Sequence, residues 1–372
     1  MLRLIFQRGV AFSLQWCKNS EEANNVEGKN KNGWWLAAAG IGAVAVYTAL
    51  KKTRPDFDFQ NRVVLITGGS RGLGLVLARH LAERGARIAI CARNGEELLR
   101  AKEDLKTRGA EVFQTVCDVR NQSEVNRMIE EVRNHYGQID VLINNAGVIQ
   151  VGPLEVQTQE DFETAMAIHF WGPYYTMNAV LPEMKRRGEG RIVNISSIGG
   201  KMSVPHLAPY CASKFALVGL SGAMRVELEK DNIFVTTVCP GLMRTGSHVN
   251  AVFKGQNEKE FAWFSIGNAL PVSSVSAESA AEQIIEACRR GNAELIISVQ
   301  AKFAAAMNNL FPELTAEISG LVNRVLPAAG GIGENHALGK DSASAISPSF
   351  LTALADKESY RNNELEPNEQ LN

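Results

Sequence analysis

Apolar residues gather in short runs along most of the chain, and longer segments of mixed polarity separate these runs. The runs are rich in β-branched and aliphatic residues, as buried strands are, and they cover residues 62–68, 86–92, 111–119, 139–147, 190–197, 232–241 and 293–299. The intervening segments have helical length, among them 73–84, 95–108, 121–136 and 208–230. This alternation predicts a doubly wound α/β domain with a parallel seven-stranded sheet and helices on both faces.

The N-terminal region breaks this pattern. After an N-terminal segment, 1–32, the run "GWWLAAAGIGAVAVYTAL" at 33–50 carries no charge. A helix of this length is about 27 Å long and nearly spans a hydrocarbon core of about 30 Å. We therefore predict a transmembrane helix, with a buried core helix or a secretory signal as alternatives. Lys51, Lys52 and Arg54 follow at once, which places the large C-terminal part in the cytoplasm as a single-pass membrane protein.

The C-terminal region divides in two by composition. Residues 301–326 carry apolar side chains at near-helical spacing, and Pro312 interrupts them. They predict a C-terminal helical extension of two short helices, whose apolar face would cover the active site, pair with another subunit or lie on a membrane. Residues 327–372 are rich in Pro, Gly, Ser, Asn and charge, which predicts a disordered tail.

Charge and cysteine content narrow the function classes. The 39 basic and 40 acidic residues give a formal net charge of -1, which argues against nucleic-acid binding. The six cysteines form no C-x-x-C pair and are expected to be reduced thiols. The six histidines are scattered without an H-E-x-x-H motif, so no metal site is predicted.

A glycine-rich turn follows the first predicted strand. The motif "TGGSRGLG" (67–74) stands between a buried strand and a helix. Its glycines allow a tight turn and close approach of a pyrophosphate, and the helix start offers free N–H groups and a positive dipole end. This context predicts a dinucleotide site. The candidate contacts in the turn are Gly68, Ser70, Arg71, Gly72, Leu73 and Gly74.

The end of the second predicted strand indicates which dinucleotide is bound. NAD sites place a carboxylate there, whereas this chain reads "CARN", with Arg93 after Ala92. Arg93 and Arg71 could pair with a 2′-phosphate, which favours NADP as the cofactor. The alternative is that both arginines are solvated surface charges.

These motifs together resemble the short-chain dehydrogenase/reductase family. The resemblance covers residues 58–300 and rests on "TGGSRGLG" (67–74), Asp118 in "CDV", "NNAG" (144–147), Ser197 in "ISS", "YCASK" (210–214) and "PGLMRT" (240–245). It implies a single Rossmann-type catalytic domain that carries both cofactor and substrate sites and assembles as a homo-oligomer. By this resemblance the cofactor also meets Asp118, Val119, Asn145, Ala146, Gly147, Pro240, Gly241 and Thr245.

The "YCASK" motif places a phenol and an ammonium on one helix face. Tyr210 is our candidate general acid/base, and the charge of Lys214 is expected to lower its pKa from about 10. Ser197 would hydrogen-bond the substrate oxygen. By family resemblance Lys214 also holds the nicotinamide ribose.

One position departs from the family pattern. His169 stands where the family usually has an Asn that supports a proton relay from the lysine to solvent. A histidine could serve that relay, or it could be packed in the core.

The sequence says least about the substrate. The segment after Thr245 mixes Phe253, Phe261, Trp263 and Phe264 with polar residues, and these aromatic side chains could line an apolar pocket or dock a lid on the core. We predict a membrane-anchored, NADP-dependent oxidoreductase that moves a hydride between nicotinamide and a lipophilic carbonyl or secondary alcohol. The alternatives are a cytosolic NAD-linked dehydrogenase and a non-catalytic NADP-binding sensor or scaffold.

Overall fold

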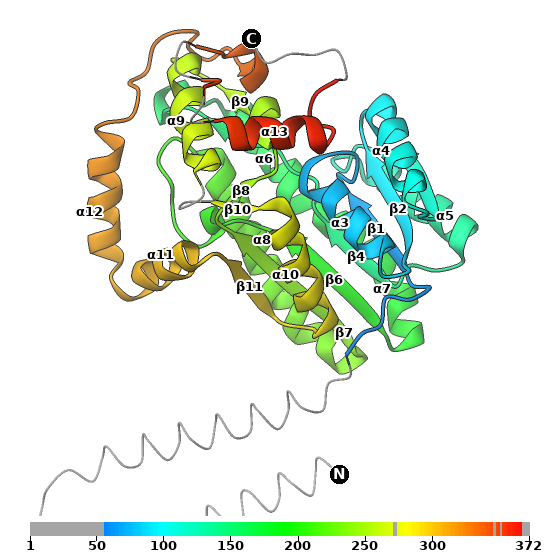
Figure 1. The fold of residues 1–372 in the computed structure, drawn as a ribbon. Helices are drawn as coiled ribbons and strands as arrows, with labels where there is room; N and C mark the ends of the chain where they lie inside the picture. The colour runs from blue at the N-terminus through cyan, green and yellow to red at the C-terminus, as the bar shows by residue number, and fades with distance from the viewer. Residues whose placement is uncertain (1–55, 271–273, 345–346, 350–351, 367–372) are drawn as a thin grey trace, which may run out of the picture. The chain divides into compact units, whose positions relative to one another are not determined.

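The central element is a parallel sheet of seven strands in the order β11-β7-β6-β4-β1-β2-β3 (Figure 1). The computed structural model describes residues 56–270, 274–344, 347–349 and 352–366. The strands are β1 (Val63–Thr67), β2 (Arg87–Ala92), β3 (Val112–Val116), β4 (Val141–Asn144), β6 (Gly190–Ile195), β7 (Ile233–Pro240) and β11 (Glu294–Ile297). Each lies within one of the seven predicted apolar runs, so the predicted sheet is confirmed.

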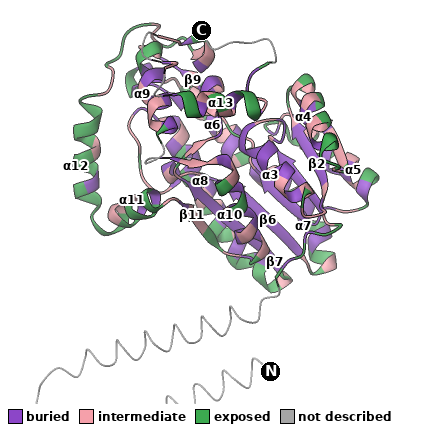
Figure 2. Cartoon of the chain, in the orientation of Figure 1, coloured by how far each residue is buried: buried purple, intermediate pink, exposed green. Residues whose placement is uncertain are grey.

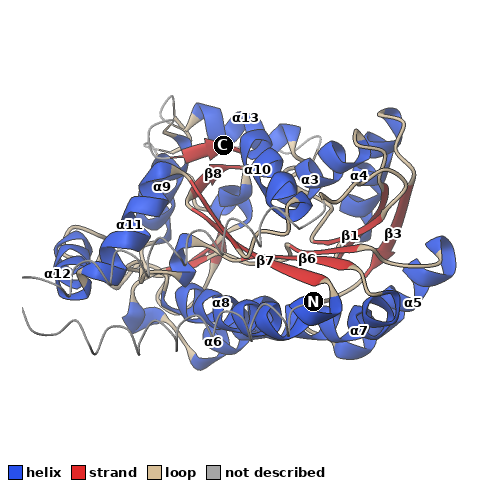
Figure 3. Cartoon of the chain, turned by 90° about the horizontal axis from the view of Figure 1, so that it is seen from below, coloured by secondary structure: helices blue, strands red, loops and turns tan. Residues whose placement is uncertain are grey.

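Helices cover both faces of this sheet (Figure 3). One layer contains α3 (Gly72–Ala82), α4 (Gly95–Thr107) and α10 (Ala277–Arg289), and the other contains α5 (Gln122–Tyr136), α7 (Gly172–Arg187) and α8 (Ala208–Leu228). The strands are apolar on both sides because each side has its own core. Leu75 and Ile284 belong to one core, and Met128 and Met177 belong to the other.

Two small sheets border the carboxyl ends of the main strands. One joins β5 (Gln150–Val151), β9 (Val252–Phe253) and β12 (Ala337–Leu338), and the other joins β8 (Leu242–Arg244) and β10 (Ser274–Ser276). Helix α9 (Asn257–Ala269) packs beside them. The sequence pattern predicted none of these short strands, because two or three residues are too few to show a period.

The C-terminal extension forms two helices, as predicted. Helix α11 (Val299–Leu310) ends before Pro312, which occupies the first turn of α12 (Pro312–Asn323). Figure 2 shows α12 largely exposed. The large apolar side chains exposed along this extension are Val299, Phe303, Leu310, Phe311, Leu314, Ile318, Leu321, Val322 and Val325.

The predicted disorder of residues 327–372 is wrong for the part that the structure describes. That part contains β12, a 3₁₀ turn (Gly339–Asp341) and helix α13 (Ala353–Arg361), drawn in red in Figure 1. Polar contacts hold it to the domain. The Arg79 guanidinium donates to Asn362 Oδ1 at 3.0 Å and to the Arg361 carbonyl at 3.0 Å. Composition misses such contacts because their partners lie almost 300 residues away.

The predicted transmembrane helix at 33–50 and the segment 1–32 lie outside the described residues. Within the described ranges, no helix combines the length and apolarity that a membrane crossing requires.

Candidate active site

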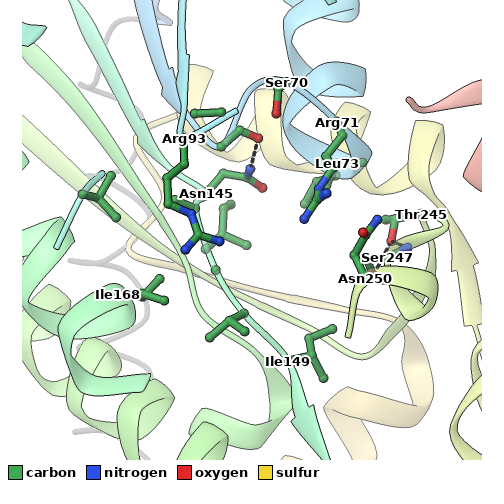
Figure 4. A pocket seen from close by; sticks show the side chains of 18 of the residues that line it. Ser70, Arg71, Leu73, Arg93, Asn145, Ile149, Ile168, Thr245, Ser247 and Asn250 are labelled. Carbon is green, nitrogen blue, oxygen red and sulfur yellow. Dashed lines mark hydrogen bonds between the residues drawn. The ribbon is translucent and has the colours of Figure 1, made fainter. Parts of the chain in front are cut away.

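A cavity of about 670 Å³ lies at the carboxyl ends of the central strands (Figure 4). Most residues predicted from the sequence line it: Gly68, Ser70, Arg71, Gly72, Leu73, Arg93, Asp118, Val119, Asn145, Ala146, Gly147, His169, Tyr210, Lys214 and Thr245. Gly74, Ser197, Pro240 and Gly241 were also predicted and are not among its lining residues. Motifs spread over 180 residues are thus brought to one end of the sheet.

Strand pairing aligns the glycine-rich turn with the "NNAG" motif. Thr67 is the register partner of Asn144, so both strands end at the same level. The Thr67 hydroxyl accepts hydrogen bonds from the Asn145 and Ala146 N–H groups, each at 3.1 Å. The Asn145 amide in turn donates to the Gly68 carbonyl at 2.9 Å. These bonds fix the shape of the turn beside the cavity.

The glycines of the turn leave no space for side chains. Gly68 has φ +63°, and a Cβ atom there would lie 2.8 Å from the Ala146 Cα. A Cβ atom at Gly74 would lie 2.1 Å from the Gly68 carbonyl oxygen, so Gly74 serves packing and does not face the cavity. Helix α3 begins at Gly72 and presents its N-terminus to the cavity. The turn therefore fits a dinucleotide pyrophosphate.

Two arginines occur at the end of the cavity near β2, in different surroundings. Arg93 is exposed, and its side chain reaches into the cavity (Figure 4). Arg71 already pairs with Glu97 at 3.1 Å and with Glu364 at 3.3 Å. The sequence predicted the two arginines as equivalent, but the structure shows that only Arg71 is held by these two carboxylates.

Helix α8 places Tyr210 and Lys214 at the other end of the cavity. The Lys214 ammonium is buried, lies 5.6 Å from the centre of the Tyr210 ring and donates to the Ile195 carbonyl at 2.9 Å. Ser197 follows β6, and its hydroxyl accepts a hydrogen bond from the Gly199 N–H at 3.1 Å. Three of the four predicted catalytic side chains, Ser197, Tyr210 and Lys214, therefore come from the end of one strand and the start of one helix.

Burial controls the protonation of Tyr210 and Lys214 at this end of the cavity. It raises the pKa of Tyr210 to about 12, while a hydrogen bond with Ser197 acts in the opposite direction. Burial also lowers the pKa of Lys214 to about 7. The expected lowering of the phenol pKa by Lys214 is wrong for the chain without its cofactor, because loss of water outweighs the effect of a neighbouring ammonium that is itself only partly charged.

His169 lies in a π-helical turn (Ala167–Trp171) before α7, and both its ring nitrogens are hydrogen-bonded. The Val148 N–H donates to Nε2 at 3.1 Å, so the proton of the neutral ring is on Nδ1, which contacts the Ser213 hydroxyl at 2.7 Å. Ser213 then donates to the Tyr210 carbonyl at 2.8 Å. Burial, followed by the charge of Lys214, lowers the pKa of His169 well below 6.5. This geometry favours the packed core histidine over the proton relay.

Pro240 and Gly241 were also predicted, and they support the site without lining the cavity. Pro240 ends β7, and a Cβ atom at Gly241 would lie 3.0 Å from the Ser298 hydroxyl. Gly241 thus allows α11 to start close to the sheet.

The aromatic residues after Thr245 do not line the cavity. Phe253, Phe261 and Phe264 are buried together, and Trp263 packs against them. Smaller apolar side chains line the cavity instead, among them Val148, Ile149, Ala251, Val252 and Leu338, and both Ile149 and Tyr210 pack against the cluster that contains Ala251. Of the two alternatives stated for these aromatic side chains, docking on the core is therefore correct.

Sequence reasoning missed six polar residues that line the cavity: Asn94, Glu97, Ser196, Ser247, Asn250 and Glu364. Glu97 could have been found, because it stands three residues after Asn94, whose side chain caps the start of α4. No local signal marks Glu364, which comes from the tail.

Comparison with known proteins agrees with this geometry. The family model for short chain dehydrogenases matches residues 62–254. A putative ketoacyl reductase of Streptomyces coelicolor is 39% identical over 187 residues, which are 50% of this chain and 72% of that protein. A dehydrogenase/reductase SDR family protein 7-like of Anopheles gambiae is 31% identical over 285 residues, which are 73% of this chain and 88% of that protein.

Solved structures lead to the same family. A variant of actinorhodin polyketide ketoreductase with NADPH has a TM-score of 0.58 and 31% identity, and the match covers 64% of this chain and 95% of that one. A short-chain dehydrogenase from Streptomyces avermitilis has a TM-score of 0.60 and 28% identity, covering 72% and 99%. This chain therefore belongs to the short-chain dehydrogenase/reductase family and is an oxidoreductase that acts on CH–OH and C=O groups with a nicotinamide cofactor.

Proposed function

We propose that the protein reduces lipophilic ketones or aldehydes with NADPH. The observation that carries this proposal is the arrangement of the site: Tyr210 and Lys214 line a cavity that also has apolar lining residues, and Ser197 hydrogen-bonds with Tyr210. Carbonyl reduction needs a proton donor, a donor to the carbonyl oxygen and a hydride source at one place.

The phenol has the protonation state that reduction requires. With a pKa of about 12, Tyr210 is protonated near neutral pH and can donate its proton to an oxygen that gains negative charge. By the family resemblance, the Ser197 hydroxyl, which hydrogen-bonds with Tyr210, would donate to the same substrate oxygen.

When bound, the nicotinamide ring supplies the hydride. Lys214 is buried beside Tyr210 and is the group best placed to hold the adjoining ribose, as the family resemblance implies. A hydrogen bond from its ammonium to a ribose hydroxyl would also recover part of the free energy lost in burying the charge.

NADP is favoured over NAD because Arg93 reaches into the cavity at the end of β2. A guanidinium can bind a 2′-phosphate through two parallel hydrogen bonds. NAD remains the second candidate on a specific observation: the Glu97 carboxylate also lines the cavity and could accept hydrogen bonds from ribose hydroxyls.

We further propose that residues 33–50 anchor the chain to a membrane, with the catalytic domain on the cytoplasmic side. This rests on the length and apolarity of that run and on the basic residues after it. Membrane partitioning of the full chain should exceed that of a chain lacking residues 1–52. Equal partitioning of the two chains would contradict a membrane anchor at residues 33–50.

Turnover tests the main proposal. With NADPH and methyl ketones of increasing chain length, kcat/KM should rise by about fourfold per methylene until the apolar wall is filled. Leu338→Ala should flatten that rise, because Leu338 contributes to the wall. Equal turnover of short and long ketones would reject a lipophilic substrate. Cofactor binding without turnover of any ketone would favour the sensor or scaffold.

A further inference from the structure

Residues 362–364, near the end of the described chain, contact both walls of the cofactor cavity. One wall is the glycine-rich turn with the start of α4, and the other is the loop after β7, residues 245–250. The glycine-rich turn and Thr245 were predicted from the sequence, whereas Asn250 was missed and the tail segment that joins the walls was predicted to be disordered. We call this segment the clasp.

Three contacts tie the clasp to the turn. The Gly72 N–H donates to the Asn362 carbonyl at 2.9 Å. The Asn363 amide donates to the Ser70 carbonyl at 2.8 Å. The Glu364 carboxylate pairs with Arg71 at 3.3 Å.

Further contacts tie the clasp to the opposite loop. The Asn250 amide donates to the Glu364 carboxylate at 2.8 Å and to its backbone carbonyl at 2.7 Å. The Asn362 amide donates to the Thr245 carbonyl at 3.3 Å. Glu364 is thus one carboxylate shared between a cationic side chain of one wall and an amide of the other.

The clasp is anchored where it lies. Arg79, which is 8% exposed, donates to Asn362 Oδ1, and Arg100 donates to Asn363 Oδ1 at 2.8 Å. The Glu364 side chain is 3% exposed. A carboxylate buried to this extent is costly unless it is paired and hydrogen-bonded, and its partners here are residues that line the cofactor cavity.

We propose that Glu364 is a positioning residue for the cofactor, acting through Arg71 and Asn250. This inference rests on the proposed binding of a nicotinamide dinucleotide in this cavity. Because one carboxylate holds both side chains, the walls are ordered before the cofactor arrives, and less conformational entropy is lost on binding. We expect the effect to extend to both cofactors, because the glycine-rich turn fits the pyrophosphate that NADPH and NADH share.

The opposite effect, tighter cofactor binding after removal of Glu364, also has a physical basis. A carboxylate near a pyrophosphate repels it, and removing such a charge would tighten binding. The Arg71 guanidinium and the Asn250 amide offset that repulsion, because they neutralise and hydrogen-bond the carboxylate on the two sides where it is held. We therefore expect the ordering effect to outweigh the repulsion.

Fluorescence titration and stopped-flow release of NADPH and NADH from the full chain test this inference. Glu364→Ala should raise Kd for both cofactors by about tenfold, mainly through faster release, and leave kcat within about twofold. Glu364→Gln should lie between, because its amide oxygen still accepts from Asn250 while the pairing with Arg71 is lost. In an Arg71→Ala background, the effect of Glu364→Ala should shrink.

Glu96→Gln is the matched control, since Glu96 is an exposed carboxylate of α4 that does not line the cavity, and its loss should leave both Kd values unchanged. Tighter binding or unchanged Kd in Glu364→Ala would overturn the inference, and so would a loss of kcat as large as the change in Kd. Absence of binding by the unaltered chain would instead overturn the proposed function. If Glu364→Ala does not fold, the Kd values of Glu364→Gln, measured with Arg71 present and in the Arg71→Ala background, decide the question.

Discussion

The two ends of the cavity are built on different physical principles. At the catalytic end, Lys214 is buried, Tyr210 lies beside it, and loss of water shifts both pKa values. At the other end, Arg93 is exposed, and Arg71 and Glu97 lie partly in solvent and form an ion pair. Burial therefore governs protonation at one end, and we propose that the charge of Arg93 sets cofactor choice at the other.

This difference separates the effects that substitutions should have. Apart from Lys214, which is proposed to hold the ribose, changes at the catalytic end should alter rates and pH dependence while leaving cofactor affinity close to that of the unaltered chain. Changes at the charged end should alter affinity and its dependence on salt, because exposed charges are screened whereas buried ones are not. A substitution that moved both quantities together would break the comparison.

The largest effect is expected from Tyr210→Phe. Loss of the phenol hydroxyl removes the proton donor, so kcat for ketone reduction should fall by about 10³-fold. The Kd for NADPH should change by less than about twofold, because the ring and its packing remain. A fall in affinity of similar size would show that the two ends are not separable.

The next effect concerns Lys214 and pH. Its folded pKa of about 7 lies below the ordinary 10.5, so between these values the unfolded chain holds a proton that the folded chain lacks. The stability of the unaltered chain relative to Lys214→Met should therefore rise with pH across this window, by at most about 1.4 kcal/mol per pH unit. Below about pH 7 the difference should be constant. Chemical denaturation of the cofactor-free chains at several pH values measures it, and a flat difference across the window would contradict burial as the cause.

The smallest effect is expected from His169→Asn. The shorter side chain cannot hold both Val148 and Ser213, so unfolding free energy should fall by about 1 kcal/mol and kcat by a few-fold. The shape of the kcat–pH profile should stay the same, because the folded histidine remains neutral. Loss of one limb of that profile would support the alternative, a proton relay through His169.

Stability gives a second readout for His169. Its folded pKa lies well below 6.5, so the unfolded chain takes up the proton first as pH falls. The unaltered chain should lose stability below about pH 6.5 relative to the variant. Equal losses in both chains would place the titration elsewhere.

The sequence predicted what depends on local pattern. Seven apolar runs predicted the sheet, and the glycines of 67–74 marked the turn because close backbone approach excludes side chains there. Tyr210 and Lys214 could be placed on one helix face from their spacing alone. These features need no knowledge of distant contacts.

Features that depend on distant contacts were missed. The sequence treated Arg71 as available for a phosphate, yet Glu364, almost 300 residues later, pairs with it. The polar tail looked disordered because its stability comes from hydrogen bonds to other elements and not from an apolar face of its own. The phenol pKa was misjudged because burial cannot be read from spacing.

We propose that Arg93 selects NADPH at the charged end of the cavity, and calorimetric titration is the measurement that decides this. The unaltered chain, Arg93→Ala and the control Arg108→Ala, at the far end of α4, would each be titrated with NADPH and NADH. We predict tighter binding of NADPH by the unaltered chain and the control, and a loss of about 10- to 100-fold in Arg93→Ala that brings NADPH to the NADH level. Equal affinity of the unaltered chain for both cofactors, or an NADPH preference that survives in Arg93→Ala, would show that Arg93 does not select NADPH.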